Sequence, residues 1–423
     1  MQDRVILHCD LNNFYASVES LYHPELQGLA IAVCGNPEER KGIVLAKNTI
    51  AKGYGVKTGE TIWEARKKCP DLHIVKPHHS MYLRFSREAR DIYRRYTDKI
   101  EPFGIDECWL DITHLMRDYS VEERYRRGEG IAYDIKETIK QELGITASVG
   151  VSFNKIFAKL GSDLKKPDAV TVIRTDNFKE KIFELDVRDL LYVGKSTYKK
   201  LEKIGIVTIG NLAECDRRIL DKILGKWGGM LWEYANGLDD SEVTLVDDES
   251  EAKGIGNSIT FPKDLESIDE IKCAFFTLAE SVGRRLRDKN LRGKTVQISI
   301  KDSNLSTIER QETHPRYLYS TDLIAKKALD IFHKNWKLER DGAIRALGIR
   351  VTNFEEGNEG MQLDLAHEAE REVKNDRIEE CIDKIRDRYG YYKIQRGILL
   401  NNEELQGDLS EEHIIHPEGF KRK

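Results

Sequence analysis

The sequence lacks the features that would direct a chain into a membrane or out of the cell. It has no apolar run long enough to span a bilayer, and its first residues lack the apolar core of a signal peptide. The seven cysteines are scattered and never spaced as C-x-x-C, which argues against a disulfide framework and against a zinc site. No solenoid repeat is present. We therefore expect a protein of the cytoplasm that does not contact a membrane.

The net charge of −5 gives no sign of a nucleic-acid partner, but the charges are unevenly distributed. Residues 284–301 contain seven arginines and lysines and a single acid, Asp288, whereas residues 239–252 are acidic and contain no base. A local positive field attracts nucleic acid even when the average charge of the protein is negative. The segment 284–301 is therefore a candidate DNA-binding surface, although a charged run more often marks a solvated face.

A chain of 423 residues is too long for one core, so roughly two to four domains are expected. Residues 4–10 predict a buried strand that ends at Asp10, and residues 13–23 and 80–98 predict helices. Residues 99–113 predict two strands joined by a tight turn. A helix at 120–143, a strand at 146–152 and a helix at 153–163 complete an order that fits a ferredoxin-like sheet. Between them, residues 59–69 predict a helix with Thr58 as its N-cap.

The pattern changes from residue 187. Residues 187–238 are purely helical with glycine-bearing turns, and the acidic stretch 239–252 predicts a linker. Residues 253–354 return to mixed structure, with strands near 254–261, 294–301, 306–313 and 344–353 and helices at 267–289 and 320–336. One further amphipathic helix is predicted at 368–388. The predicted fold class is therefore α+β, with several domains.

Three acids are candidate ligands for the metal ions that nucleotide transfer requires. Asp10 ends a buried strand, where a carboxylate is costly unless it binds a metal or reaches the rim of the sheet. Asp106 and Glu107 lie at the corner of the predicted hairpin. Neighbouring strand residues point to opposite faces, so both can serve one site only if the turn bends the backbone between them. Taken singly, each acid is more often a turn or cap residue than a catalytic one.

Three stretches resemble the signature motifs of the Y-family DNA polymerases, in the DNA polymerase IV branch of bacteria. They are C-D-L-N-N-F-Y-A-S-V-E (9–19), G-I-D-E-C-W-L-D (104–111) and S-V-G-V-S-F-N-K-I-F-A-K-L-G-S-D-L-K-K-P (148–167). The resemblance covers roughly residues 1–354 and implies a right-hand polymerase. Its parts would be a ferredoxin-like palm (1–12 and 80–173), small fingers (13–79), a helix-hairpin-helix thumb (174–238), a linker (239–252), an α/β little finger (253–354) and a C-terminal tail (355–423).

The resemblance also implies roles for single residues. Asp10, Asp106 and Glu107 would be catalytic and, with the main-chain carbonyl of Leu11, would hold two Mg²⁺ ions. Tyr15 would be the steric gate, a wall that excludes the 2′-hydroxyl of a ribonucleotide. The incoming dNTP would be bound by Asn12, Asn13, Phe14, Thr49, Lys52 and Lys166. The family usually has a Y-x-x-R pair at the positions of Thr49 and Lys52, and lysine lacks the bidentate fork of arginine, so the triphosphate contacts there stay open.

The helical region contains V-G-K-S-T-Y-K-K-L-E-K-I-G-I (193–206), which resembles a helix-hairpin-helix. Gly194 and Lys195 would meet a DNA phosphate, because such a turn presents main-chain N–H groups. Tyr192 replaces one of the family's two glycines, and an ordinary helical hairpin is the alternative. In the little finger, the DNA-binding residues implied by the basic segment are Arg284, Arg285, Arg292 and Lys294.

The tail contains Q-L-D-L-A (362–366), which resembles the pentapeptide that binds the sliding clamp in bacterial polymerases. The clamp-binding residues would be Gln362, Leu363, Asp364 and Leu365, with Ala366 where an aromatic residue is usual. A clamp would tether the enzyme to DNA by raising its effective concentration there.

The implied activity is template-directed DNA synthesis from dNTPs on primer–template DNA, by a monomer. No segment is left over for a proofreading exonuclease, so we expect low fidelity and passage of damaged template bases. Two other functions are open: a nucleotidyl cyclase, which shares a ferredoxin-like palm, and a catalytically inactive scaffold bound to the clamp. The motifs do not specify which lesions are passed, the error signature, or further partners of the tail.

Overall fold

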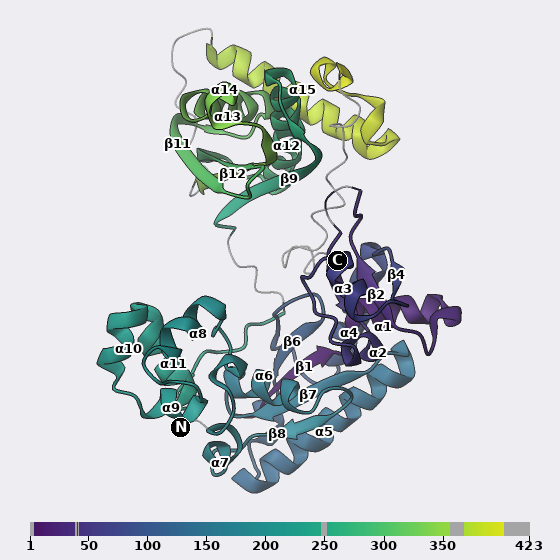
Figure 1. The fold of residues 1–423 in the computed structure, drawn as a ribbon, viewed down its shortest axis with the longest axis vertical. Coiled ribbons are helices and arrows are strands. Elements are labelled where there is room, and N and C mark those ends of the chain that lie inside the picture. Colours follow the sequence, from purple (N-terminus) through teal and green to yellow (C-terminus); the bar gives the residue numbers. More distant parts are fainter. Residues whose placement is uncertain (1–3, 39, 41, 247–251, 356–367, 402–423) are drawn as a thin grey trace. The chain divides into compact units, whose positions relative to one another are not determined.

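The computed structural model describes residues 4–246 apart from 39 and 41, together with residues 252–355 and 368–401. The chain divides into two compact units, each with its own hydrophobic core. One consists of Met1–Gly35, Ile43–Asp248 and Ile414–Lys423, and the other of Asn36–Gly42 and Glu249–His413. Figure 1 shows their elements. Within the described part of the chain, no helix combines the length and apolarity that crossing a bilayer requires.

The first unit is built on a five-stranded sheet in the order β5-β6-β1-β7-β8. Figure 1 labels β6, β1, β7 and β8 of this sheet. β1 is antiparallel to both of its neighbours, and β8 is parallel to β7. The chain passes through β1, α4, β5, β6, α5 and β7, which is the ferredoxin-like order that the sequence predicted. The short strand β8 was not predicted. The bounds are β1 (Ile6–Leu11), α4 (His79–Tyr93), β5 (Ile100–Pro102), β6 (Glu107–Asp111), η2 (Thr113–Met116), α5 (Val121–Leu143), β7 (Ala147–Ser152), α6 (Lys155–Leu164) and β8 (Val170–Val172).

A small subdomain is inserted between β1 and α4, around a sheet in the order β3-β2-β4. Its α3 helix begins after Thr61 and not after Thr58, so the predicted N-cap was wrong. The hydroxyl of Thr61 accepts the N–H of Glu64 (3.2 Å), and Glu64 accepts the N–H of Thr61 (2.9 Å). Only Thr61 has a glutamate three residues later, which this capping box requires. The elements are α1 (Phe14–Tyr22), η1 (Pro24–Leu26), β2 (Ile31–Cys34), β3 (Val44–Lys47), α2 (Thr49–Gly53), α3 (Ile62–Lys68) and β4 (His73–Val75).

The chain from residue 187 to 235 is helical, as predicted, with η3 (Val187–Asp189), α8 (Lys195–Glu202), α9 (Ile209–Glu214), α10 (Arg217–Leu224) and α11 (Lys226–Ala235). A short helix that was not predicted, α7 (Phe178–Ile182), precedes them. The predicted linker begins by packing on the five-stranded sheet of the first unit. Val243 is buried beside Ile6 and Trp109, and Arg4 donates a hydrogen bond to the carbonyl of Ser241 (2.9 Å). Residues 239–246 therefore belong to the first unit and do not form a free connection.

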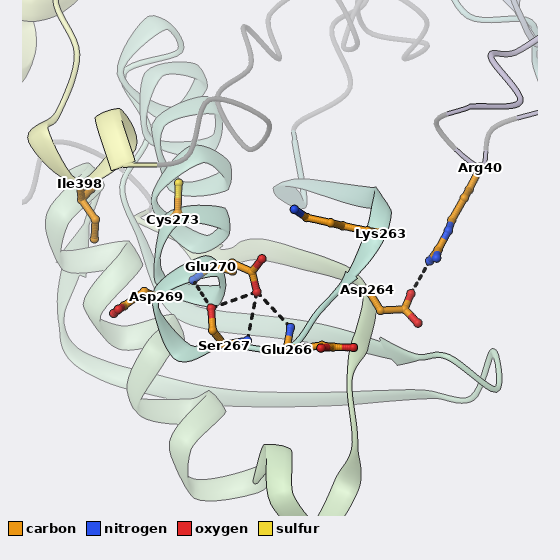
Figure 2. A pocket seen from close by; sticks show the side chains of 9 residues that line it. All are labelled: Arg40, Lys263, Asp264, Glu266, Ser267, Asp269, Glu270, Cys273 and Ile398. Carbon is orange, nitrogen blue, oxygen red and sulfur yellow. Dashed lines mark hydrogen bonds and ion pairs between the residues drawn. The ribbon is translucent and has the colours of Figure 1, made fainter.

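The second unit has a four-stranded antiparallel sheet in the order β11-β10-β12-β9, packed against α12 and α13. Figure 2 shows the first turn of α12, where Ser267 and Glu270 form a capping box. Alternate residues of β10, such as Ile298 and Ile300, are buried in the core of this unit. The bounds are β9 (Gly254–Leu265), α12 (Ile268–Asp288), β10 (Gly293–Asp302), β11 (Thr307–Leu318), α13 (Thr321–Asn335), α14 (Leu338–Asp341) and β12 (Ile344–Phe354).

The helix predicted in the tail is α15 (Glu368–Tyr389), followed by η4 (Tyr391–Lys393) and η5 (Gly397–Asn401). It is docked on α12 through ion pairs. Arg287 of α12 pairs with Asp383 (2.5 Å), and Glu280 of α12 pairs with Arg386 (3.1 Å). All but Asp383 expose less than a tenth of the side chain, and Asp383 exposes 12%. The described part of the tail is therefore part of the second unit.

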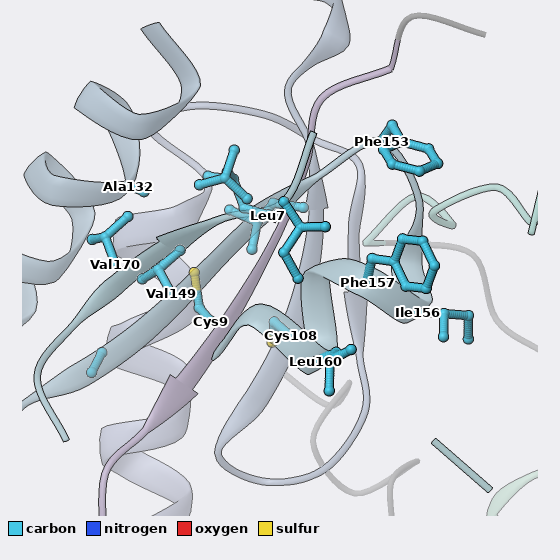
Figure 3. Packing of buried hydrophobic residues seen from close by; sticks show 14 of the residues in the cluster. Leu7, Cys9, Cys108, Ala132, Val149, Phe153, Ile156, Phe157, Leu160 and Val170 are labelled. Atoms are coloured by element: carbon cyan, nitrogen blue, oxygen red, sulfur yellow. The ribbon is translucent and has the colours of Figure 1, made fainter. Parts of the chain in front are cut away.

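Strand β1 positions the candidate site through its alternation. Leu7 and Cys9 lie in the main core of the first unit, which Figure 3 shows with residues of β7 and α6. The opposite face of β1 is covered by α6. This helix lies very close to β7, because a Cβ atom on Gly150 would be 1.9 Å from the carbonyl oxygen of Ala158. His8 and Asp10 share the face that α6 covers, so the helix can place side chains against them.

Candidate active site

The three predicted acids come together at the end of the two central strands. Asp10 and Glu107 are direct partners across β1 and β6, so their side chains leave the sheet on the same face. Asp106 lies just before β6, and its carbonyl oxygen accepts the N–H of Leu11 (3.0 Å). Glu107 therefore lies in the strand and Asp106 just outside it. The backbone bends between them, so both side chains can serve one site.

These acids line one cavity of about 450 Å³ together with residues of the inserted subdomain. Both kinds of predicted residue, those assigned to metal and those assigned to nucleotide, lie in its wall. They are Asp10, Leu11, Asn12, Asn13, Phe14, Tyr15, Thr49, Lys52, Asp106, Glu107 and Lys166. Lys47 also lines the cavity and was not predicted; burial and the neighbouring Lys52 lower its pKa.

Two lysines and a histidine surround the acids. The ammonium of Lys166 lies 2.5 Å from the carboxylate of Asp10. The ammonium of Lys159, from α6, lies 3.0 Å from the carboxylate of Glu107 and 3.4 Å from that of Asp10. The Nε2 atom of His8 lies 3.3 Å from the Glu107 carboxylate. The site therefore holds opposite charges at contact distance, with Asp106 outside these pairs.

The acids are held in different charge environments. Burial, and then the charges of Asp10 and Glu107, raise the pKa of Asp106 from 3.8 to about 7. Burial also raises the pKa of Asp10, although the ammonium of Lys166 opposes that shift. Negative charge is thus crowded around Asp106, and the ammonium of Lys166 offsets only part of it.

Glu107 differs from the two aspartates. Burial alone would raise its pKa, but the contacts with His8 and Lys159 outweigh burial and hold the pKa below its ordinary value. Burial lowers the pKa of His8 to about 4, so its imidazole is neutral at pH 7. The contact between His8 and Glu107 is therefore not an ion pair, and the charge partner of Glu107 is Lys159.

The donor atoms fit a hard divalent cation in their chemistry. Three carboxylates and the carbonyl of Leu11 are the oxygen ligands that Mg²⁺ prefers. One oxygen of Glu107 is buried and makes no hydrogen bond, although His8 and Lys159 are near it. Over the described ranges, no three His, Cys, Asp or Glu side chains form a ready group of metal ligands. Lysine ammonium groups engage the acids here, so binding of a cation requires those lysines to turn away.

The predicted gate lies on the helix that follows β1. Tyr15 is in the first turn of α1 and stacks on Tyr82 with the ring centres 4.0 Å apart. Asn13, with φ of 50°, joins the strand to this helix, and its amide donates a hydrogen bond to Thr49 (3.2 Å). Asn12 is buried, and its amide contacts Ser148 (2.9 Å). The side chain of Asn12 is thus engaged with β7.

The residues predicted to bind DNA lie in two places. Gly194 and Lys195 are exposed at the start of α8, where Gly194 is an N-cap without a side-chain hydrogen bond. Tyr192 precedes them with φ of 71°, a left-handed conformation that glycine would adopt more easily. Tyr192 therefore adopts the left-handed backbone conformation that a glycine would take in this turn.

In the second unit, the basic segment is divided between a helix and a strand. Arg284 and Arg285 lie on α12, where Arg284 pairs with Asp387 of α15 and Arg285 donates a hydrogen bond to the carbonyl of Gly256 (2.9 Å). The other two cations lie over aromatic rings, Arg292 at 4.3 Å from Tyr319 and Lys294 at 4.4 Å from Tyr317. The clamp motif, Gln362, Leu363, Asp364 and Leu365, lies outside the described residues.

Sequence reasoning missed His8 and Lys159. His8 had a local signal, because it lies two residues before Asp10 on a strand and so shares its face. Lys159 lies within the third motif, but its position depends on α6 packing across β1. That packing follows from Gly150 and Gly161, whose backbones come within close contact. The glycines in the motif were the signal that could have located Lys159.

Two sequence models of the impB/mucB/samB family match the chain. The family model matches residues 9–163, and the model of the C-terminal domain of that family matches residues 252–365. The first match covers Asp10, Asp106 and Glu107, and the second lies within the second unit.

Several relatives match this sequence over nearly its whole length. DNA polymerase IV of Acetivibrio thermocellus is 54% identical over 401 residues, which is 94% of this chain and 98% of that protein. DNA polymerase IV of Clostridium kluyveri is 38% identical over 403 residues, 94% of this chain and 98% of that protein. DNA polymerase IV 1 of Bacillus subtilis is 36% identical over 406 residues, 95% of each chain. A solved Y-family DNA polymerase chimera has the same fold, with a TM-score of 0.72 at 24% identity over 84% of this chain and 100% of that one.

Proposed function

The chain belongs to the impB/mucB/samB family, the Y-family DNA polymerases, in the DNA polymerase IV branch, and we propose how its residues divide the work of DNA synthesis. It is a DNA-directed DNA polymerase that extends a primer with dNTPs on a DNA template and acts in translesion synthesis and repair. A nucleotidyl cyclase and an inactive scaffold are not favoured, because these relatives are polymerases and all three acids are present.

The observation that carries the proposal is the meeting of Asp10, Asp106 and Glu107 in one cavity with Tyr15 and Lys166. Divalent cations belong to this family's reaction, and we assign two Mg²⁺ ions to the three carboxylates and the carbonyl of Leu11. When bound there, the cations would offset the charge of the triphosphate and favour ionisation of the primer 3′-hydroxyl. The carboxylates supply the negative charge that would hold the cations, and their burial reduces screening of that charge by water.

Lys166 is the residue we assign to the triphosphate. Its ammonium is paired with Asp10 at 2.5 Å, so it lies beside the acid cluster. A triphosphate beside the cluster would compete with Asp10 for this ammonium, and a cation would replace it on the carboxylate. Asn13, Phe14, Thr49 and Lys52 line the same cavity, and we assign them to the rest of the nucleotide, with Asn12 as their support on β7.

Tyr15 is assigned as the gate that rejects ribonucleotides. Its ring lies in the wall of the cavity and is backed by a second aromatic ring, so the wall is rigid. A wall rejects an added hydroxyl by overlap only when it does not yield. Tyr15→Ala should therefore admit rNTPs, as measured by the ratio of kcat/KM for dCTP and rCTP. An unchanged ratio would remove Tyr15 from the gate.

The remaining assignments concern DNA and partners. We propose that Gly194 and Lys195 bind the duplex through its phosphates, and that Arg292 and Lys294 do so in the little finger. Arg284 and Arg285, both on α12, have intramolecular partners in α15 and β9, so the same role for them requires those contacts to open. We further propose the palm, fingers, thumb, little finger and tail boundaries given above, clamp binding through Gln362–Leu365, a monomer, low fidelity and a cytoplasmic location.

Primer extension with dNTPs and Mg²⁺ tests the proposed site. Asp106→Ala should abolish extension, because it removes the acid that faces both others. The matched control is Glu142→Ala, which removes an exposed carboxylate of α5 paired with Arg95 and should leave extension unchanged. Extension by Asp106→Ala at the wild-type rate would refute the assignment of the acids. Template-independent formation of a cyclic product from NTPs would point to a cyclase instead.

A further inference from the structure

A buried carboxylate lies one helical turn beyond the proposed gate and is not explained by the metal site. Glu19 is in α1, four residues after Tyr15, so the two side chains lie on the same side of the helix. Glu19 is fully buried. A carboxylate is expensive to bury unless several donors satisfy it, which makes the partners of Glu19 informative.

The partners of Glu19 come from the start of α4. Its carboxylate accepts hydrogen bonds from the hydroxyl of Tyr82 and from the main-chain N–H of His78 (3.3 Å), and the His78 imidazole lies 3.0 Å from it. The N–H of His78 also donates to the Tyr82 hydroxyl (3.1 Å). Glu19 therefore joins the middle of α1 to the first turn of α4, at an end of α4 where N–H groups lack helical partners.

Tyr82 contacts two successive turns of α1. Its ring stacks on the ring of Tyr15 with 12° between their planes, and its hydroxyl reaches Glu19. The ring of His79 meets both tyrosines edge-on, with ring centres 6.0 Å from Tyr15 and 5.7 Å from Tyr82. The hydrogen bond to Glu19 holds the far end of the Tyr82 side chain, so the ring cannot swing away from Tyr15 while its hydroxyl is held.

We propose that Glu19 is a positioning residue for sugar selection, which holds the ring of Tyr82 and through it the ring of Tyr15 against the 2′ position of the incoming nucleotide. The inference rests on the proposed role of Tyr15 as the gate. Glu19 does not touch the nucleotide; it makes the wall stiff. A gate that shifts by a fraction of an ångström accepts a ribose, so the loss of Glu19 lowers selection without removing the aromatic wall.

The alternative explanation is that Glu19 has a purely structural role, in which it joins two helices and contributes to stability. The two explanations differ in what happens to the preference for dNTPs. A purely structural residue changes the amount of folded enzyme, which affects kcat/KM for dCTP and for rCTP equally. A positioning residue changes their ratio, and it does so only while the Tyr15 ring is present.

The experiment measures kcat/KM for dCTP and rCTP opposite template guanine with the full-length enzyme. Glu19→Ala should lower the dCTP preference about tenfold, which corresponds to about 1.4 kcal/mol. Tyr82→Phe keeps the ring and removes only the hydroxyl, and it should lower the preference in the same direction. Glu19→Gln retains a carbonyl oxygen that can accept from Tyr82 and should keep most of the preference. Glu280→Gln, which alters a buried carboxylate of the second unit, is the control and should leave the ratio unchanged.

A double variant tests whether Glu19 acts through the ring of Tyr15. Tyr15→Ala should abolish most of the preference, and adding Glu19→Ala to it should lower the ratio no further. Equal ratios in wild type, Glu19→Ala and Tyr82→Phe, beside a normal loss in Tyr15→Ala, would overturn this inference and leave the gate intact. An unchanged ratio in Tyr15→Ala would refute the gate itself. If Glu19→Ala does not fold, Tyr82→Phe decides alone, because it removes one hydroxyl and leaves the packed ring in place.

Discussion

Replacing Asp106 by asparagine should make the cation-free protein more stable while it abolishes synthesis. The carboxylate of Asp106 faces Asp10 and Glu107, and burial with these two charges raises its pKa from 3.8 to about 7. At pH 8 the group is ionised in both the folded and the unfolded chain, so the folded state bears the full repulsion. Asparagine has nearly the same shape and carries no charge, so the repulsion disappears.

The size of the effect follows from the shift in pKa. A shift of about 3 pKa units corresponds to about 4 kcal/mol, and because the site is partly open to water we expect about half, roughly 2 kcal/mol. For a folded unit of this size that is an increase in Tm of roughly 4–8 °C. The pH dependence has a defined sign. Between the ordinary pKa and about 7 the folded state holds a proton that the unfolded state has released, so the stability of the wild type falls as pH rises through this window. Asp106→Asn should show a flatter curve.

Thermal unfolding in EDTA and in excess Mg²⁺ measures both halves of the prediction. In EDTA at pH 8, Asp106→Asn should melt above the wild type. Mg²⁺ should raise the Tm of the wild type, by about 2.7 kcal/mol of stabilisation at a hundred times Kd, and should raise that of the variant much less. The control is Asp163→Asn, because Asp163 pairs with Lys159 (3.1 Å) and Lys166 (2.6 Å), and its loss should not stabilise the protein. An Asp106→Asn variant that is less stable than the wild type in EDTA would refute the charge argument, and equal gains from Mg²⁺ would remove Asp106 from the cation site.

Three further predictions concern the triphosphate, the packing of α6 and the tail. Lys166→Ala should raise KM for dNTPs about tenfold in steady-state extension, because it removes a charged contact, and an unchanged KM would exclude Lys166 from the triphosphate site. Gly150→Ala should lower the free energy of unfolding by more than about 3 kcal/mol, since its Cβ would lie 1.9 Å from a main-chain oxygen of α6, whereas Gly53→Ala, with open space around the position, should be nearly neutral in thermal melts. Replacing Gln362 and Leu365 by alanine should abolish stimulation of synthesis by a loaded sliding clamp and leave synthesis without the clamp unchanged; continued stimulation would place clamp binding elsewhere.

Much of the fold could be predicted from local pattern, because long helices and alternating strands carry their own signal. The palm order, the helical stretch and the second mixed region were predicted and are confirmed. The short strands β4 and β8 were missed, since three residues carry too little periodicity to be recognised. The start of α3 was misplaced by three residues because two threonines compete for the N-cap, and the choice depends on Glu64.

The acids were predictable as candidates because the motifs around Asp10 and Asp106 are long, but their environment was not. The low pKa of His8 and the ion pairs of Lys159 depend on α6 lying across β1, and no local pattern states which helix covers which strand. Glu19 is a second residue whose environment the local sequence does not give. Within the motif it looks like any exposed acid on an amphipathic helix, and only the approach of α4 turns it into a fully buried group that binds the hydroxyl of Tyr82. A motif therefore identifies the groups that meet the substrate, whereas the residues that stiffen them become visible only once the packing between helices is known. For that reason the selectivity of this enzyme should be sought as much in the contacts behind Tyr15 as in Tyr15 itself.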